Sequence, residues 1–269
     1  MQNDTVFAGS IPELYDRYLG PLIFAPYAAD LAARLSDFMG AAHVLETAAG
    51  TGIVTRALDK AMPASVSIVA TDLNQAMLDH GAKQLASTRV AWRQADAAAL
   101  PFPDAHFDAV VCQFGAMFFP DKVKAFGEAR RVLKEGGRFV FNVWARIEEN
   151  EFPHVVMGTL ARVFPDDPPK FMERTPHGYH DTKRIVEDLR RAGFARLDIE
   201  TVAKMSDAPS AREPAIGFCQ GTPMRGEIEA RDKTRLGEAT DAAEQALVAR
   251  FGKGPISGKI SAHVITAWR

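Results

Sequence analysis

Short apolar runs alternate with amphipathic segments between about residues 40 and 145. The apolar runs are rich in β-branched residues and predict buried strands; they are HVLETA (43–48), SIVATD (67–72), VAWRQAD (90–96), FDAVVCQF (107–114) and RFVFNVWA (138–145). Between them, apolar positions at helical spacing predict helices over 53–62, 74–86 and 121–136. This alternation is typical of a parallel sheet with helices on both faces.

The flanking segments are less regular. Residues 182–194 predict an amphipathic helix, and 195–204 and 258–269 predict strands. Residues 1–39 look helical, 150–180 hold one helix and a Pro-rich loop, and prolines interrupt the helical pieces of 207–256. We therefore expect one α/β domain over 1–269. Its core comprises 40–145, 182–204 and 258–269, and its cover segments are 1–39, 146–180 and 207–256.

Composition narrows the class of protein. The chain has 269 residues, 47% of them hydrophobic, and its 32 basic and 34 acidic residues give a net charge of −2. Without a basic stripe, a nucleic acid is not an expected partner. Cys112 and Cys219 are far apart, so neither a metal site nor a disulfide framework is expected. There is no secretory signal and no apolar run long enough to span a membrane, which predicts a soluble, cytoplasmic protein.

Acidic residues end the first three predicted strands. Glu46, Asp72 and Asp96 stand at these ends, and ligands of open parallel sheets lie beyond the carboxyl ends of the strands. The small residues of 48–52 allow the backbone to approach a ligand closely. Asp72 suits two ribose hydroxyls, and Asp96 suits an adenine amine, with the Ala97 amide donating to the ring. Three acids favour a nucleoside with a neutral or positive body over a pyrophosphate.

Each acid also has a purely structural interpretation. Asp72 fits as a cap for the helix that starts at Asn74, Glu46 as the partner of a flanking base, and Asp96 as support for the AAAL turn that follows it. These three roles would have to coincide on successive strand ends, which favours the ligand interpretation.

Four segments together resemble a known family. VLETAAGTG (44–52), ATDLNQAML (70–78), QADAAALPFPDAHFDAVVCQFGAMFFPD (94–121) and EARRVLKEGGRFVFNVW (128–144) resemble, in order and spacing, the class I S-adenosylmethionine-dependent methyltransferases. The pattern is similar to the small-molecule branch related to the ubiquinone/menaquinone-biosynthesis enzymes (methyltransferase type 11). The resemblance implies a Rossmann-like, doubly wound, mainly parallel seven-stranded sheet with an antiparallel last strand. It covers about 40–145 strongly and the flanks loosely.

The resemblance implies S-adenosyl-L-methionine as cofactor, S-adenosyl-L-homocysteine as product, and a role for each matched position. Gly50 would approach the cofactor most closely, and a glycine usually stands where this chain has Ala48. The implied cofactor-binding residues fall into five groups: Glu46, Ala48, Gly50 and Gly52 around the methionine part; Asp72 at the ribose; Leu73, Met77, Asp96 and Ala97 at the adenine; Gln113 and Phe114 along the route to the acceptor; and Tyr15 and Tyr18 closing over the cofactor.

The acceptor half is less defined. We expect methyl transfer to O, N or C of a small organic acceptor by in-line displacement, with a general base only if the acceptor must lose a proton. His180, before the apparent helix cap Asp181, is the catalytic candidate, with His154 and His177 as others, and His263 is expected to be structural. Residues 218–231 fit either a lid or an ordinary helical surface. Phe114, Phe118 and Phe119 fit either an aromatic wall for the sulfonium or the core.

Two other functions share features with this sequence. A nicotinamide-dependent oxidoreductase calls for GxGxxG, but Thr51, Gly52, Ile53, Val54 and Thr55 follow Gly50, with no third glycine in place. A non-catalytic S-adenosylmethionine-binding protein of the same fold stays open. The sequence does not specify the acceptor, and it leaves open a monomer or a homodimer.

Overall fold

The computed structural model describes residues 11–38 and 40–269. Contacts between residues divide the chain into two compact units. Unit 1 comprises the residues up to Phe24 together with Trp144–Gly178 and Ala203–Ser261, and unit 2 comprises Ala25–Val143, Tyr179–Val202 and Ala262–Arg269. Unit 1 thus holds most of the segments predicted to cover the sheet. That the whole chain acts as a single domain stays a prediction.

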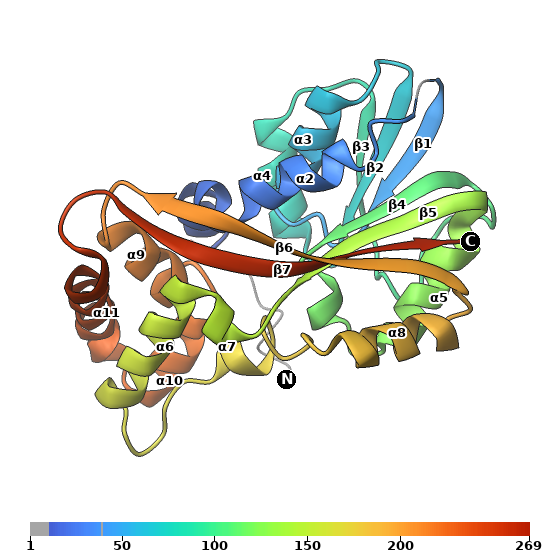
Figure 1. The fold of residues 1–269 in the computed structure, drawn as a ribbon. Helices are drawn as coiled ribbons and strands as arrows, with labels where there is room; N and C mark the ends of the chain where they lie inside the picture. The colour runs from blue at the N-terminus through green and yellow to red at the C-terminus, as the bar shows by residue number, and fades with distance from the viewer. Residues whose placement is uncertain (1–10, 39) are drawn as a thin grey trace. The chain divides into compact units, whose positions relative to one another are not determined.

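Seven strands form one sheet in the order β3-β2-β1-β4-β5-β7-β6 (Figure 1). The strands are β1 Ala42–Glu46, β2 Val66–Asp72, β3 Val90–Gln94, β4 Phe107–Gln113, β5 Leu133–Trp144, β6 Arg196–Ala208 and β7 Ile256–Trp268. The pairs among β1 to β5 are all parallel.

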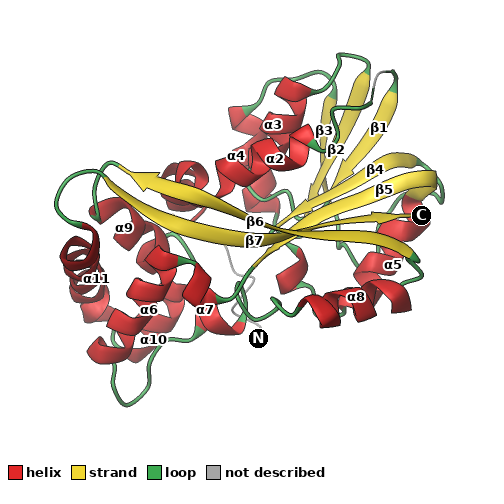
Figure 2. Cartoon of the chain, viewed as in Figure 1, coloured by secondary structure: helices red, strands yellow, loops and turns green. Residues whose placement is uncertain are grey.

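Strand β7 runs in the opposite direction to β5 (Figure 2). Arg269 donates its N–H to the Gly137 carbonyl, whereas Ala145, later in the chain, donates to the carbonyl of the earlier Ser261. Partners that advance in opposite directions define an antiparallel pair. The predicted fold class, a mainly parallel seven-stranded sheet with an antiparallel last strand, is confirmed.

Helices follow most of the predicted segments. The α-helices are α1 Ile11–Leu14, α2 Ala25–Ala33, α3 Ile53–Ala61, α4 Gln75–Gln84, α5 Lys122–Val132, α6 Glu151–Val163, α7 Phe171–Arg174, α8 Thr182–Arg191, α9 Arg212–Gln220, α10 Met224–Arg231 and α11 Leu236–Phe251. A π-helix, η1, spans Tyr15–Phe24, and three 3₁₀ turns are η2 Ala116–Phe118, η3 Ile147–Glu149 and η4 Lys233–Arg235. No described helix combines the length and apolar character needed to cross a membrane.

The sheet of unit 2 is buried on both faces. On one face, Leu31 of α2 and Leu58 of α3 pack with Val44 and Val140 in a cluster of fully buried side chains. On the other, Phe126 of α5 contacts Phe139 and Phe141 of β5, with ring centroids 5.7 and 5.2 Å away. This two-sided burial explains why the strands appear as near-continuous apolar runs rather than as alternating patterns.

The boundary between α5 and β5 differs from the prediction. The helix expected over 121–136 ends at Val132, and β5 begins at Leu133 instead of Arg138. Leu133 is fully buried and pairs with Phe107 of β4, so tertiary pairing overrides the helical pattern. Gly136, with φ +76°, takes a left-handed conformation inside the strand, where glycine is the residue best able to do so.

Candidate cofactor site

The predicted acids lie along one edge of the sheet. Glu46 ends β1, Asp72 ends β2, and Asp96 follows β3 by two residues. These three strands are neighbours and parallel, so their carboxyl ends meet at the same edge. The backbone N–H of Gly50, in the turn after β1, donates to Asp72 Oδ2 at 2.8 Å. The structure therefore joins the first two predicted elements directly.

The turn after β1 contains three left-handed residues. Ala48, Gly50 and Gly52 have φ values of +53°, +56° and +77°. The left-handed region costs a non-glycine residue roughly 1 kcal/mol or more, so Ala48 is the unusual member. Space explains how its methyl group is tolerated: a Cβ on Gly115 would lie 2.4 Å from that of Ala48, so the missing side chain of Gly115 leaves room for it.

The two glycines of this turn have different surroundings. Among the described residues, a Cβ on Gly50 would meet only the methyl group of Met77, at 3.5 Å, which leaves this position open toward a ligand. A Cβ on Gly52 would lie 2.4 Å from the ring of Trp92, and one on Gly81 of α4 would lie 2.8 Å from the same ring. Trp92 of β3 therefore fills the space left by two glycines and supports the turn, a role that the sequence interpretation missed.

Glu46 is almost completely buried, with 1% of its surface exposed. Its Oε2 accepts a hydrogen bond of 2.6 Å from Thr55 Oγ1. Burial raises the pKa of Glu46 to about 8, Thr55 opposes the shift, and the nearby Asp72 adds to it. Its hydrogen-bond partner is this hydroxyl, and the charge of the flanking base Arg56 also lowers its pKa. The carboxyl group is mostly protonated at neutral pH.

Asp72 fulfils its predicted structural role at the start of α4, and its ribose contact stays a prediction. It is 9% exposed, and besides the Gly50 N–H it accepts the Asn74 N–H at 2.8 Å through Oδ1, which supports the start of α4. Burial raises its pKa, and the backbone donors oppose that shift. Each carboxylate oxygen has two acceptor positions, so these bonds leave room for ribose hydroxyls.

An apolar side chain stands in solvent beside Asp72. Leu73 is 55% exposed, and it shares this property with only one other large hydrophobic residue of the described chain, Met205. Met77 is buried, next to the Gly50 position. The predicted adenine contacts of Leu73 and Met77 match this placement and stay predictions.

The loop after β3 begins with a tight turn. Asp96 is exposed, its Oδ1 accepts the Ala98 N–H at 2.8 Å, and its carbonyl accepts the Ala99 N–H at 3.0 Å. The structural role weighed for Asp96 is thus present, while its carboxylate remains accessible. The predicted adenine contacts of Asp96 and Ala97 stay predictions.

At the end of β4, Phe114 has φ +49°, and its ring lies edge-on to that of Tyr27 at 5.4 Å. Its N–H donates to Oδ1 of Asn142, a fully buried residue that pairs with Gln113 across β4 and β5. Because an N–H only donates, this bond fixes the orientation of the Asn142 amide. Within the described chain, Nδ2 of Asn142 has no hydrogen-bond partner. The sequence interpretation passed over Asn142 as one more strand residue.

The histidine candidates take different positions. Asp181 caps α8 as expected, because its side chain accepts the Lys183 N–H, and His180 directly precedes it. His177, in unit 1, is buried and donates from Nδ1 to the Ala145 carbonyl at 2.8 Å. His263 bonds Thr201 through Nδ1 at 2.9 Å, in agreement with a structural role. The catalytic role of His180 stays a prediction.

Two further cofactor candidates lie in unit 1. Tyr15 and Tyr18 belong to the π-helix η1, where Tyr15 stacks on Phe24 at 4.7 Å. Their cofactor roles stay predictions, as does the lid role of 218–231. Cys219 of unit 1 and Cys112 of unit 2 are buried free thiols, and burial raises the pKa of each to about 12. Neither is a thiolate at neutral pH.

Comparisons with known proteins agree with this geometry. Residues 45–141 match the model of the methyltransferase domain family. The ubiquinone/menaquinone biosynthesis C-methyltransferase UbiE of Pseudomonas paraeruginosa is 40% identical over 110 residues, which cover 39% of this chain and 43% of that protein. The chain thus matches less than half of the length of this curated relative.

Two solved structures share the fold. Phosphoethanolamine N-methyltransferase 2 of Haemonchus contortus, in complex with phosphomonomethylethanolamine and S-adenosylhomocysteine, aligns with TM-score 0.63 at 16% identity, covering 99% of this chain and 59% of that one. The [4+2]-cyclase SpnF aligns with TM-score 0.53 at 21% identity, covering 90% and 80%. Such identities establish the fold alone. The resemblance to S-adenosylmethionine-dependent methyltransferases predicted from the sequence is confirmed, and residues 45–141 match a methyltransferase domain.

Proposed function

We propose that this protein is an S-adenosylmethionine-dependent methyltransferase that methylates a small organic acceptor at O, N or C. The observation that carries the proposal is the row of groups at adjacent strand ends: buried Glu46 and Asp72, exposed Leu73 and accessible Asp96. The left-handed turn with an open Gly50 lies beside them. These groups match, in order, an amino acid, a ribose and an adenine, with no phosphate to repel.

The residues present fit this cofactor. When bound, S-adenosylmethionine supplies a methyl group on a cationic sulfur. Glu46 would hold the ammonium group, Asp72 the ribose hydroxyls, and Asp96 with Ala97 the adenine edge. Phe114 would give the sulfonium an aromatic neighbour. Such a neighbour favours the ground-state cation less than a carboxylate would, over a transition state in which the charge is being lost. Positioning of the acceptor in line with the methyl group then supplies much of the rate.

Titration calorimetry with S-adenosylhomocysteine tests the cofactor. We expect a dissociation constant in the micromolar range, and no heat of binding at millimolar ligand would exclude the proposal. Replacing Asp72 by Ala should weaken binding by roughly 1–3 kcal/mol through the lost charge-assisted bonds. Replacing the exposed Asp79 of α4 by Ala is the matched control and should leave binding unchanged.

A panel of small acceptors tests catalysis. Transfer of a labelled methyl group to any acceptor supports the methyltransferase, and quinols are the first choice because the relative cited above acts in quinone biosynthesis. Cofactor binding without transfer to any acceptor would favour the alternative, a non-catalytic S-adenosylmethionine-binding protein of the same fold. In the same proposal the two units act as one domain, a monomer or homodimer in the cytoplasm, and His180 serves as base where the acceptor must lose a proton.

A further inference from the structure

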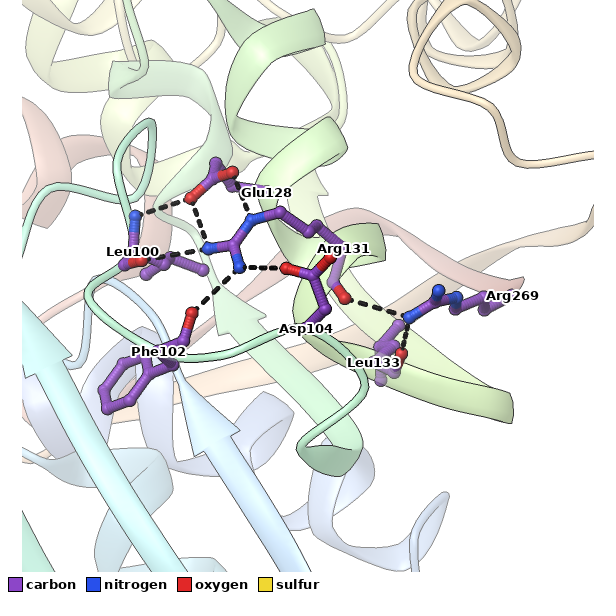
Figure 3. A network of polar contacts seen from close by, with 7 residues as sticks. All are labelled: Leu100, Phe102, Asp104, Glu128, Arg131, Leu133 and Arg269. Atoms are coloured by element: carbon purple, nitrogen blue, oxygen red, sulfur yellow. Dashed lines mark hydrogen bonds and ion pairs between the residues drawn. The ribbon is translucent and has the colours of Figure 1, made fainter.

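One ion pair on helix α5 holds the loop that follows β3 (Figure 3). Arg131 Nη1 donates to the Phe102 carbonyl at 2.8 Å and to Asp104 Oδ1 at 2.7 Å, and Nη2 donates to the Leu100 carbonyl at 3.0 Å. Nε and Nη2 also bind the two oxygens of Glu128, at 2.7 and 2.8 Å. These contacts match in number the five N–H donors of a guanidinium group.

Glu128 makes a second backbone contact with Leu100. Its Oε2 accepts the Leu100 N–H at 2.8 Å while Arg131 binds the Leu100 carbonyl, so the pair holds both backbone groups of that residue. The hydrogen bond from Arg131 lowers the pKa of Glu128, which keeps the pair ionised near neutral pH. The two side chains thus make, with the N–H and carbonyl of Leu100, the two hydrogen bonds that the backbone of a neighbouring strand could make.

A short piece of chain links Leu100 to Asp96 and Ala97, the residues predicted to bind adenine. Leu100 is buried and follows directly on the turn from Asp96 to Ala99. At the other end of this turn, the Ala95 N–H donates to the Asp72 carbonyl at 3.0 Å. The four residues between are thus fixed at both ends, at one by β2 and at the other by α5.

We propose that Arg131 and Glu128 are positioning residues for recognition of the adenine base. By fixing Leu100, they hold the Asp96 carboxylate and the Ala97 N–H at the separation needed to form hydrogen bonds with the exocyclic amine and a ring nitrogen of adenine. The inference rests on the proposed function, because it presumes that the cofactor binds. It assigns base selectivity of the site to a helix that does not itself touch the base.

A ligand with an altered base edge distinguishes a positioning role of Arg131 and Glu128 from a contribution to protein stability alone. S-inosylhomocysteine has an oxygen where S-adenosylhomocysteine has the exocyclic amine, so it repels a carboxylate that accepts from that amine. We expect the wild-type protein to bind S-adenosylhomocysteine at least about 10-fold more tightly than the inosyl analogue. In Arg131→Met and Glu128→Gln this ratio should fall to about 2 or less, as the carboxylate loses its fixed place. Arg131→Lys should also lose most of this preference, because one ammonium group cannot replace a planar guanidinium group that binds two carbonyls and two carboxylates.

Arg89 provides the matched control. It stands just before β3 and bonds Asp59 at 2.7 Å and the Met62 carbonyl at 3.2 Å, so it fixes backbone at the end of α3 rather than in the loop after β3. Arg89→Met should lower the melting temperature as Arg131→Met does, yet keep the wild-type ligand ratio. If Arg131→Met does not fold, the ratio in Glu128→Gln and Arg131→Lys decides. The inference is overturned if folded variants keep the wild-type selectivity. It is also overturned if the wild type binds S-adenosylhomocysteine without selectivity over the inosyl analogue. If the wild type does not bind S-adenosylhomocysteine at all, the proposed function itself is overturned.

Discussion

The turn after β1 and the loop after β3 lie at the same edge of the sheet, yet different forces hold them in place. The turn depends on shape: left-handed glycines, the ring of Trp92, and a buried carboxyl group that is mostly neutral at pH 7. The loop depends on charge: the Arg131 and Glu128 side chains are 31% and 20% exposed and remain ionised. The turn would hold the charged methionine end of the cofactor, and the loop its uncharged base.

The difference has an energetic consequence. Overpacking a close-packed segment typically costs 1–3 kcal/mol, whereas an exposed ion pair contributes about 0–1 kcal/mol. Changes in the turn should therefore act on folding, and changes in the loop mainly on what the site selects. Substitutions in the two segments test this division.

Gly52→Ala should destabilise the protein by about 2–4 kcal/mol, because it adds a left-handed alanine and a clash with Trp92. Gly136 is the matched control, since its φ of +76° nearly equals the +77° of Gly52 and no atom of the described chain beyond its neighbours lies within 4 Å of a Cβ placed there. Gly136→Ala should cost only about 1 kcal/mol. Urea unfolding of both variants measures the difference.

The excess cost at position 52 should depend on Trp92. In the background of Trp92→Leu, the two glycine substitutions should cost nearly the same, because the ring that Cβ meets is gone. An excess that persists in this background would show that the turn is not held by Trp92, and the contrast drawn above would fail.

Glu46→Gln tests whether the turn excludes charge. The pKa of Glu46, about 8 in the folded protein, lies above the roughly 4.3 of an unfolded glutamate. The folded state thus binds the proton more tightly, and wild-type stability falls as pH rises through this window, by at most about 1.4 kcal/mol per pH unit. The Gln variant lacks this loss. Its stability relative to the wild type should therefore rise from pH 5 to 8 and level off above pH 8.

Calorimetry in buffers of different ionisation enthalpy extends the same test to the ligand. An ammonium group favours ionised Glu46, so S-adenosylhomocysteine should release a fraction of a proton at pH 7 from the wild type and none from this group in Glu46→Gln. Asp72, Arg56 and Cys112 act on Glu46 or are acted on by it, and all stay in place in the variant. Glu135→Gln, at an exposed position, is the control for charge removal. Parallel stability curves for wild type and Glu46→Gln across pH 5–8 would contradict the prediction.

Leu73→Ala should affect binding and spare folding. Because the side chain is 55% exposed, its loss should leave the melting temperature nearly unchanged. If an adenine covers it, affinity for S-adenosylhomocysteine should fall by about 1 kcal/mol, near 5-fold. Met205→Ala removes a side chain of similar exposure, 53%, and should change neither quantity. Equal affinities for wild type and Leu73→Ala would remove Leu73 from the site.

The sequence revealed the strands and the acids at their ends because both are local patterns: apolar runs, and a carboxylate where each run stops. It did not reveal Trp92, Asn142 or Arg131, because the partners of these residues lie far along the chain. Trp92 meets Gly52 only once β3 pairs with β2, and Arg131 meets Leu100 only once α5 packs beside the sheet. The end of α5 was misplaced for the same reason, since pairing of Leu133 with Phe107 is invisible in the local pattern.

Asp104→Asn should give the smallest effect and still sharpen the comparison. Asp104 bonds Arg131 at 2.7 Å, but its side chain is 72% exposed, so solvent screens most of the attraction. Stability should change by less than about 0.5 kcal/mol, and the preference for S-adenosylhomocysteine over its inosyl analogue should stay within about 2-fold of the wild type. Glu128→Gln, which also disturbs the Leu100 N–H, should abolish that preference. Equal losses of this preference in the two variants would mean that the net charge around Arg131 orders the loop, rather than the hydrogen bonds to its backbone.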